Sequence, residues 1–292
     1  KTVLITGGSG SFGNKFVEIM VNEFHPKKLI VFSRDEMKQD QMRKKFPDNG
    51  DSPLRYFIGD VRDKDRLYRA LEGVDVVVHA AALKQVVACE YNPIEAIKTN
   101  VYGAENLSDA AIDRGVAKVL ALSTDKAVNP TSVMGVSKRV AEQYCQALEL
   151  GRSSKDDTNF ITVRFGNVLG STGSVVELFR KQLSDGGPLT VTHPDMTRYF
   201  MTTREAVELV LQAAAFGVEE GGLSGKIFVL DMGEPVRIMD LARQMIRLAN
   251  LIPDEDIEIV ITGIRPGEKL FEEVLHGSEA PVKSNQEGIL IA

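Results

Sequence analysis

Short apolar runs alternate with amphipathic stretches through the first half of the chain. The runs cover residues 1–5, 28–32, 55–58, 75–79, 118–123 and 160–164. Runs that are apolar throughout are typical of strands buried on both faces of a parallel sheet. The stretches between them predict helices over residues 12–24, 35–46, 63–72, 93–114 and 133–150. This alternation predicts right-handed crossovers and an α/β fold with a doubly wound parallel sheet.

The pattern changes after residue 167, where glycine and proline become more frequent. A polar loop is expected at residues 151–157, a helix at 203–218, a strand at 227–230 and a helix at 238–250. We assign these last three elements to a smaller α/β subdomain packed on the first sheet. Residues 1–167 are therefore expected to form one domain and residues 168–292 mainly a second, with some chain returning to the first.

Composition narrows the class of protein without fixing its function. Hydrophobic residues make up 43% of the chain and charged residues 26%, and the net charge is -6. These values are typical of a soluble globular protein and weigh against a nucleic-acid partner. The two cysteines, Cys89 and Cys145, are too few for a disulfide framework. No Cys/His spacing suggests zinc, so no metal site is expected.

No apolar run is long enough to span a membrane and no signal peptide is present, which favours a cytoplasmic location. The chain begins at Lys1, directly at its first strand. A membrane segment before this fragment is therefore an open alternative, which would place this part of the protein at the inner face of a membrane.

A glycine-rich turn follows the first predicted strand. Residues 6–13 read Thr-Gly-Gly-Ser-Gly-Ser-Phe-Gly and lead into a helix. Glycines here allow a tight turn and close approach of the backbone to a pyrophosphate, which lies at the helix N-terminus. With a strand before it and a helix after it, the turn indicates a Rossmann-like dinucleotide site. The contacts expected here are Gly7, Ser9, Gly10, Ser11, Phe12 and Gly13.

The end of the second strand bears on the choice of cofactor. Ser33 and Arg34 stand where an acidic residue would bind a ribose 2′-hydroxyl, so a 2′-phosphate and NADP are favoured. Lys38 follows one helical turn later, and NAD stays possible if Arg34 pairs with Asp35 or Glu36. Further cofactor contacts are expected from Asp60 and Val61 beside the adenine and from Ala80, Ala81 and Ala82 at the sheet edge.

A hydroxyl, a carboxylate and an amine follow one another at the end of the fifth strand, as Thr124, Asp125 and Lys126. Charged neighbours at the carboxyl end of a sheet strand are usually functional, although a simple loop ion pair is the alternative. Met134 and Lys138 lie four residues apart in the following helix, and hence on one of its faces.

Several segments resemble a known family. They are residues 59–63 (Gly-Asp-Val-Arg-Asp), 79–84 (His-Ala-Ala-Ala-Leu-Lys), 122–127 (Leu-Ser-Thr-Asp-Lys-Ala), 164–171 (Arg-Phe-Gly-Asn-Val-Leu-Gly-Ser), 197–199 (Thr-Arg-Tyr) and 263–269 (Gly-Ile-Arg-Pro-Gly-Glu-Lys). Together they resemble the extended short-chain dehydrogenase/reductase superfamily, and within it the nucleotide-sugar 4,6-dehydratases that act on UDP-N-acetylglucosamine. One departure from the superfamily is clear, because Met134 stands where its catalytic tyrosine is expected.

The resemblance implies a chemistry and roles for these residues. The sugar is oxidised at C4, loses the C5 proton and the 6-hydroxyl, and regains the hydride at C6, so that a tightly bound cofactor is regenerated. Lys126 is the implied C5 base, Asp125 the acid for the 6-hydroxyl, and Thr124 the partner of the 4-hydroxyl. Lys138 holds the nicotinamide ribose and Met134 packs against sugar or nicotinamide. Asn100, a structural asparagine in the family, is expected near the cofactor.

The resemblance also implies a UDP-sugar site in the second half of the chain. Asn167 meets the substrate phosphate there, and Arg198, Arg265 and Glu268 hold the diphosphate and the uridine ribose. Ser174 and Lys84 are further expected contacts, although Lys84 is equally well read as a solvated loop lysine.

Four alternatives remain open at this point. A UDP-sugar 4-epimerase needs a tyrosine-like proton shuttle, which Met134 does not provide. A catalytically inactive NADP-binding scaffold is disfavoured by the intact Thr124–Lys126 run. The configuration at C5 is expected to be retained, with inversion as the alternative. The protein is expected to be a homo-oligomer, either a dimer or a hexamer, in bacterial surface glycan biosynthesis.

Overall fold

A nine-stranded, mostly parallel sheet forms the centre of the protein. The computed structural model describes residues 1–151, 158–216 and 226–292, so residues 152–157 of the predicted loop and 217–218 of the predicted helix lie outside the described residues. The strand order is β14-β15-β11-β6-β5-β4-β1-β2-β3. The parallel strands are β1 (Thr2–Thr6), β2 (Lys28–Ser33), β3 (Leu54–Ile58), β4 (Val76–His79), β5 (Lys118–Thr124), β6 (Asn159–Phe165) and β11 (Ile227–Leu230). The predicted Rossmann-like fold is confirmed.

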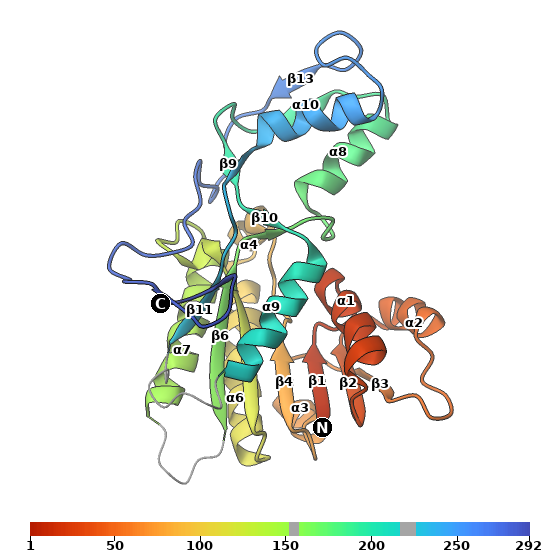
Figure 1. The fold of residues 1–292 in the computed structure, drawn as a ribbon, viewed down its shortest axis with the longest axis vertical. Helices are drawn as coiled ribbons and strands as arrows, with labels where there is room; N and C mark the ends of the chain where they lie inside the picture. Colours follow the sequence, from red (N-terminus) through yellow and green to blue (C-terminus); the bar gives the residue numbers. More distant parts are fainter. Residues whose placement is uncertain (152–157, 217–225) are drawn as a thin grey trace.

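Helices cover both faces of this sheet (Figure 1). The expected helices are present as α1 (Ser11–Ile19) with a π-helical end η1 (Met20–Phe24), α2 (Glu36–Lys45), α3 (Lys64–Ala70) and α7 (Val133–Leu150). The single helix expected over 93–114 is three consecutive pieces, α5 (Pro93–Ile97), the π-helical turn η2 (Lys98–Tyr102) and α6 (Gly103–Asp113). Helix α4 (Val86–Tyr91) was not expected, because its six residues show too little of the helical period.

Alternate residues of each central strand point into opposite cores. Val3 and Ile5 of β1 pack with Phe16 of α1 in one cluster, while Leu4 packs with Leu67 and Leu107 in the other. The period of two along a strand produces this division. Because the strand order reverses between β1 and β4, the carboxyl ends of these two strands flank the crevice in which such sheets bind ligands.

Two elements assigned to the smaller subdomain belong instead to the main sheet. β11 pairs in parallel with β6, and α9 (Thr203–Phe216) packs beside α1 through Val207 and Val210. The helix and the strand predicted for residues 203–218 and 227–230 are present, but their assignment to the smaller subdomain is therefore wrong. An apolar run shows that a strand is buried but does not show which sheet it joins. Strands β14 (Val282–Lys283) and β15 (Ile289–Ile291) also return to this sheet, in antiparallel pairing.

The smaller subdomain contains α8 (Val175–Ser184), β8 (Leu189–Val191), α10 (Ile238–Leu248) and β13 (Ile259–Ile261). It lies beyond the carboxyl ends of the main strands, at the upper end of the view in Figure 1. Phe179, Leu189 and Ile246 are fully buried in its own apolar core. Short pairs connect the two parts, β7 (Asn167–Val168) with β10 (Phe200–Met201) and β9 (Thr197–Arg198) with β12 (Val236–Arg237).

The segment after β13 runs back from the smaller subdomain to the edge of the main sheet (Figure 1). A fully buried arginine of β6, Arg164, holds it in place. Its guanidinium donates to Glu142 of α7, to Glu279 and to the carbonyl of Val274. This ion-paired cluster fixes the course of the segment that passes beside the end of β5.

In the ranges 1–151, 158–216 and 226–292, no helix combines the length and apolar character needed to cross a membrane.

Candidate active site

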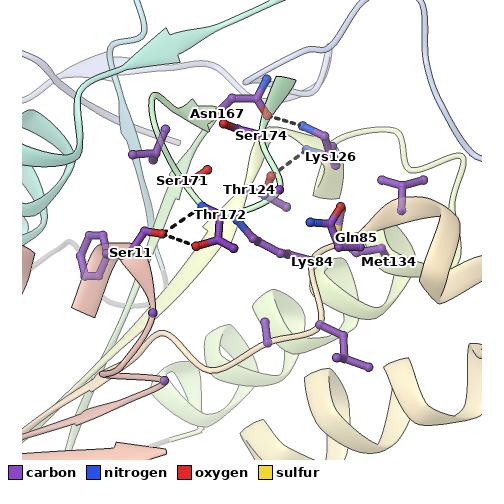
Figure 2. Close-up of a pocket in the computed structure, with 18 of the residues that line it drawn as sticks. Ser11, Lys84, Gln85, Thr124, Lys126, Met134, Asn167, Ser171, Thr172 and Ser174 are labelled. Carbon is purple, nitrogen blue, oxygen red and sulfur yellow. Dashed lines mark hydrogen bonds between the residues drawn. The ribbon is translucent and has the colours of Figure 1, made fainter. Parts of the chain in front are cut away.

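A cavity of about 840 Å³ opens between the main sheet and the smaller subdomain. It lies at the carboxyl ends of β1, β4, β5 and β6, where an α/β sheet places its ligands. All the residues predicted for the site border this cavity except Asp125 and Asn100. Elements far apart in the sequence, including the start of α1 and the segments after β4, β5 and β6, therefore meet in one place (Figure 2).

The glycine-rich turn is shaped to accept a dinucleotide. Gly7 has a φ of 65°, and a Cβ there would lie 2.9 Å from the backbone of Ala81. A Cβ on Gly13 would lie 2.1 Å from the carbonyl oxygen of Gly8, so only glycine allows α1 to start this close to β1. Among the described residues, no side chain caps the N-terminus of α1. Its free amides are a ready site for a pyrophosphate, so the residues present fit the predicted cofactor.

Arg34 borders the cavity near the end of β2 and is half exposed. It forms an ion pair of 3.4 Å with Asp60, whereas Asp35 caps α2 and pairs with Lys38 at 3.3 Å. The alternative in which Arg34 pairs with Asp35 or Glu36 is therefore wrong. Partial burial acts to raise the pKa of Asp60, but hydrogen bonds from Arg62 and its charge hold that pKa below its usual range. Among the described residues the Arg34 guanidinium donates through Nη1 alone, so its other N–H groups stay available for a ligand.

The predicted acid–base residues lie at the end of β5. Lys126 Nζ donates to Asp125 Oδ1 at 2.9 Å and to Asn167 Oδ1 at 3.1 Å, and Figure 2 shows the latter contact. Thr124 Oγ1 donates to Asp125 Oδ1 at 2.8 Å. A hydroxyl, a carboxylate and an amine thus form one connected hydrogen-bond group.

Asp125 is fully buried and lies behind Thr124 and Lys126 rather than on the cavity wall. Its Oδ2 accepts no hydrogen bond from the described part of the chain. Asn100 is also set back from the cavity, and its amide is used by Leu83 and Ser137. Asn100 therefore does not border the cavity, because it joins η2 to the segment after β4.

Met134 and Lys138 occupy the same face of α7, as their spacing predicted. Met134 is 3% exposed and packs with Cys89 and Ala96, yet it also borders the cavity. Lys138 donates to the carbonyl of Leu122 at 2.6 Å, and burial lowers the pKa of its amine. No tyrosine is found among the described residues that line the cavity.

The residues expected to hold UDP border the cavity but make contacts of their own. Arg198 donates to the carbonyls of Thr197, Lys269 and Leu270. Arg265 and Glu268 form an ion pair with each other. The buried Oγ of Ser174, at the start of α8, has no hydrogen-bond partner in the described ranges. Burial also lowers the pKa of Lys84, which projects into the cavity in Figure 2.

Comparison with known proteins identifies the family. The profile described as "Polysaccharide biosynthesis protein" matches residues 3–292. The chain belongs to this polysaccharide biosynthesis family. The protein also shares its fold with the solved structure of Pen from Bacillus thuringiensis, which is 37% identical with a TM-score of 0.91. The match covers 100% of this chain and 88% of that one.

Relatives in the family carry different names. The chain is 49% identical to the uncharacterized membrane protein MJ1061 of Methanocaldococcus jannaschii, covering 94% of this chain and 80% of that protein. It is 46% identical to the capsular polysaccharide biosynthesis protein CapD of Staphylococcus aureus, covering 96% of this chain but only 46% of CapD. A UDP-N-acetylglucosamine 4,6-dehydratase (inverting) of Campylobacter jejuni is 42% identical, covering 96% and 79%. A UDP-glucose 4-epimerase of Rickettsia massiliae is 43% identical, covering 96% and 79%.

Two residues that border the cavity, Glu272 and Thr172, were missed in the sequence. Glu272 borders the cavity next to Lys126, and Thr172 reaches across to Ser11 with an Oγ1–Oγ distance of 3.1 Å. Glu272 follows the Arg-Pro-Gly-Glu-Lys segment, but nothing in the sequence separates it from its neighbour Glu273. Thr172 lies in a polar loop, where a long-range hydrogen bond leaves no periodic signal.

Proposed function

We propose that this protein is a UDP-N-acetylglucosamine 4,6-dehydratase. The observation that carries the proposal is the Thr124–Asp125–Lys126 hydrogen-bond group at a cavity with a dinucleotide turn and no tyrosine among its described lining residues. An epimerase or simple reductase of this fold needs a phenol-like proton shuttle. Elimination of water across C5 and C6 instead needs a base and an acid side by side.

NADP is the proposed cofactor, with NAD as the alternative. Gly7, Gly10 and Gly13 would cradle its pyrophosphate, Arg34 and Lys38 its 2′-phosphate, and Lys138 its nicotinamide ribose. When bound, NADP would supply a hydride acceptor for C4 of the sugar and, once reduced, the hydride donor for C6. The residues of the chain supply the proton transfers.

The hydrogen-bond group gives a balanced path for the protons. Thr124 accepts the proton of the sugar 4-hydroxyl and passes its own to Asp125 Oδ1, 2.8 Å away. Lys126, as a neutral amine, removes the C5 proton. Asp125 then returns its proton through Thr124 to the departing 6-hydroxyl, which leaves as water. Lys126 gives its proton back to C5, so that the sum of the steps is the loss of one water molecule.

Substrate binding is proposed for the residues at the subdomain side of the cavity. Asn167, Ser174 and Lys84 offer an amide, a free hydroxyl and an amine to the sugar and phosphates. Arg198, Arg265 and Glu268 are proposed to meet the diphosphate and the uridine ribose, and Arg265 and Glu268 would then exchange their mutual ion pair for substrate contacts.

A Lys126→Ala variant tests the role of the base. Its turnover of UDP-N-acetylglucosamine should fall by about 10³-fold, because general base catalysis is typically worth about 10²–10⁴. Lys44→Ala is the matched control, since Lys44 is exposed on α2 and pairs only with Asp40 among the described residues. Unaltered turnover in Lys126→Ala would exclude the proposal and favour a non-catalytic scaffold.

Retention of configuration at C5 is the proposed stereochemical outcome, on the resemblance of residues 189–194 and 229–235 to retaining members. Inversion is the second candidate, favoured by the name of the Campylobacter jejuni relative. The UDP-glucose 4-epimerase name of another relative supports a 4-epimerase as the rival activity. A homo-oligomer and a cytoplasmic location stay predictions.

A further inference from the structure

Glu272 is a buried carboxylate in the segment that follows β13. The residue is 8% exposed and borders the cavity. Its Oε1 lies 3.7 Å from Lys126 Nζ and 3.9 Å from Arg198 Nε. Its Oε2 receives no hydrogen bond within the described residues. A buried carboxylate with one free oxygen costs free energy, so a role for it in the site is worth seeking.

Four charged groups face Glu272 from the elements packed around it. Lys126 and Asp125 come from the end of β5, Arg198 from β9 and Lys269 from the same segment. Lys269 is directed elsewhere, because its Nζ donates to the carbonyl of Val128 at 2.8 Å. Burial raises the pKa of Glu272, the charge of Asp125 raises it further, and the three cations oppose this rise.

Lys126 is consequently held between two buried carboxyl groups, Asp125 at 2.9 Å and Glu272 at 3.7 Å. We propose that Glu272 is a positioning residue that holds the amine of Lys126 at the cavity wall and sets the pH range in which the Lys126–Asp125 pair carries one proton. The inference rests on the proposed function. It concerns a residue outside the Thr124–Asp125–Lys126 run.

The number of protons on the Lys126–Asp125 pair explains why the charge of Glu272 matters. At the elimination step, after the 4-hydroxyl proton has entered through Thr124, the pair must hold one proton, either on Lys126 or, after transfer along the 2.9 Å hydrogen bond, on Asp125. Only the second form offers a neutral base and a protonated acid together. The negative charge of Glu272 makes it harder for the pair to lose this proton and easier for the pair to gain a second one. The pH range in which the pair holds one proton therefore lies higher at both its lower and its upper limit.

Glu272→Gln tests the proposal, because it keeps the size of the side chain and removes its charge. Both limbs of the kcat–pH profile should move to lower pH by about one pH unit, the usual effect of a charge within 4–6 Å. Glu272→Asp keeps the charge and should leave the limbs in place while kcat falls. Glu273→Gln is the matched control, since its neighbouring carboxylate is half exposed and should move neither limb.

A purely structural role for Glu272 would lower kcat or the melting temperature without moving the limbs. Unmoved limbs in Glu272→Gln would therefore overturn the inference. Glu272→Met, which is of similar volume and uncharged, replaces it if the glutamine variant does not fold, and the same shift is expected.

A second readout does not depend on turnover. The ¹⁵Nζ signal of Lys126, identified by its loss in Lys126→Arg, should titrate at lower pH in Glu272→Gln than in the unaltered protein. An unchanged midpoint would contradict the inference even if the dehydratase activity stands. Conversely, retained turnover in Lys126→Ala would remove the proposed function, while the titration would still report whether Glu272 controls the amine.

Discussion

At the scale of single residues, Met134 is the clearest departure from the chemistry usual for this fold. Its thioether neither gives nor takes a proton, and it is buried against Cys89 and Ala96. Met134→Leu should keep most of the activity and lose less than about 1.5 kcal/mol of stability, because the volume is conserved. Met134→Tyr should lose activity, since the larger ring overfills the site. Turnover and thermal unfolding measure both, and a more active tyrosine variant would contradict the proton path through Thr124.

The candidate site could be predicted in part from these single residues. Lys126 and Asp125 are adjacent in the sequence, so their pairing needed no knowledge of the fold. Glu272 could not be predicted, because its contact with Lys126 spans 146 positions and depends on the path of the last segment. The partner of Arg34 was missed for the same reason, since Asp60 reaches it only after β2 and β3 pair.

At the scale of elements, the loop between β7 and α8 reaches over the start of α1 through Thr172. Besides the contact between the two hydroxyls, the Thr172 backbone amide donates to Ser11 Oγ at 3.0 Å, and Figure 2 shows this bridge. Thr172→Val should release bound NADPH a few-fold to about tenfold faster, the effect of one lost hydrogen bond. Stopped-flow NADPH fluorescence measures the release. Thr172→Ser keeps the hydroxyl and should behave as the unaltered protein, and equal release rates for all three would contradict this role of the loop.

The last segment depends on the buried Arg164 cluster. Arg164→Met should cost about 3–5 kcal/mol in urea unfolding, because it leaves Glu142 and Glu279 buried without their main partner. Arg139→Met is the matched control and should cost less than about 1 kcal/mol, because Arg139 is partly exposed. A loss in Arg164→Met no larger than in this control would contradict the role of the cluster.

The same cluster predicts a pH dependence of stability. Although burial acts to raise the pKa of Glu279, hydrogen bonds from Arg164 and the His276 amide hold it below the ordinary value of 4.5. The group therefore stabilises the fold above that value, and the contribution is lost as the pH falls through the lowered pKa. In Arg164→Met this loss should disappear or reverse, which urea unfolding between pH 3 and pH 7 measures. An unchanged acid dependence in the variant would argue against the ion pair as its cause.

At the scale of the whole molecule, the parallel sheet was predictable because the strands from β1 to β6 are short, largely apolar runs, most of them buried. The antiparallel return of β14 and β15 was not, because two or three residues of extended chain carry no pattern. The placement of α9 and β11 in the main sheet depends on contacts with α1 and β6 that are remote in the sequence. This return of the chain carries the last segment past the cavity and brings Glu272 to Lys126.

The central claim, dehydration of UDP-N-acetylglucosamine, is tested most directly by a proton NMR time course in D₂O with catalytic NADP. The account predicts a new methyl signal at C6, whose splitting disappears where C5 has taken up deuterium from the base. Ring couplings in a parallel reaction in H₂O then report whether the configuration at C5 is retained or inverted. A galacto-configured anomeric signal without a methyl signal would show epimerisation, and either that result or an unchanged spectrum would contradict the account.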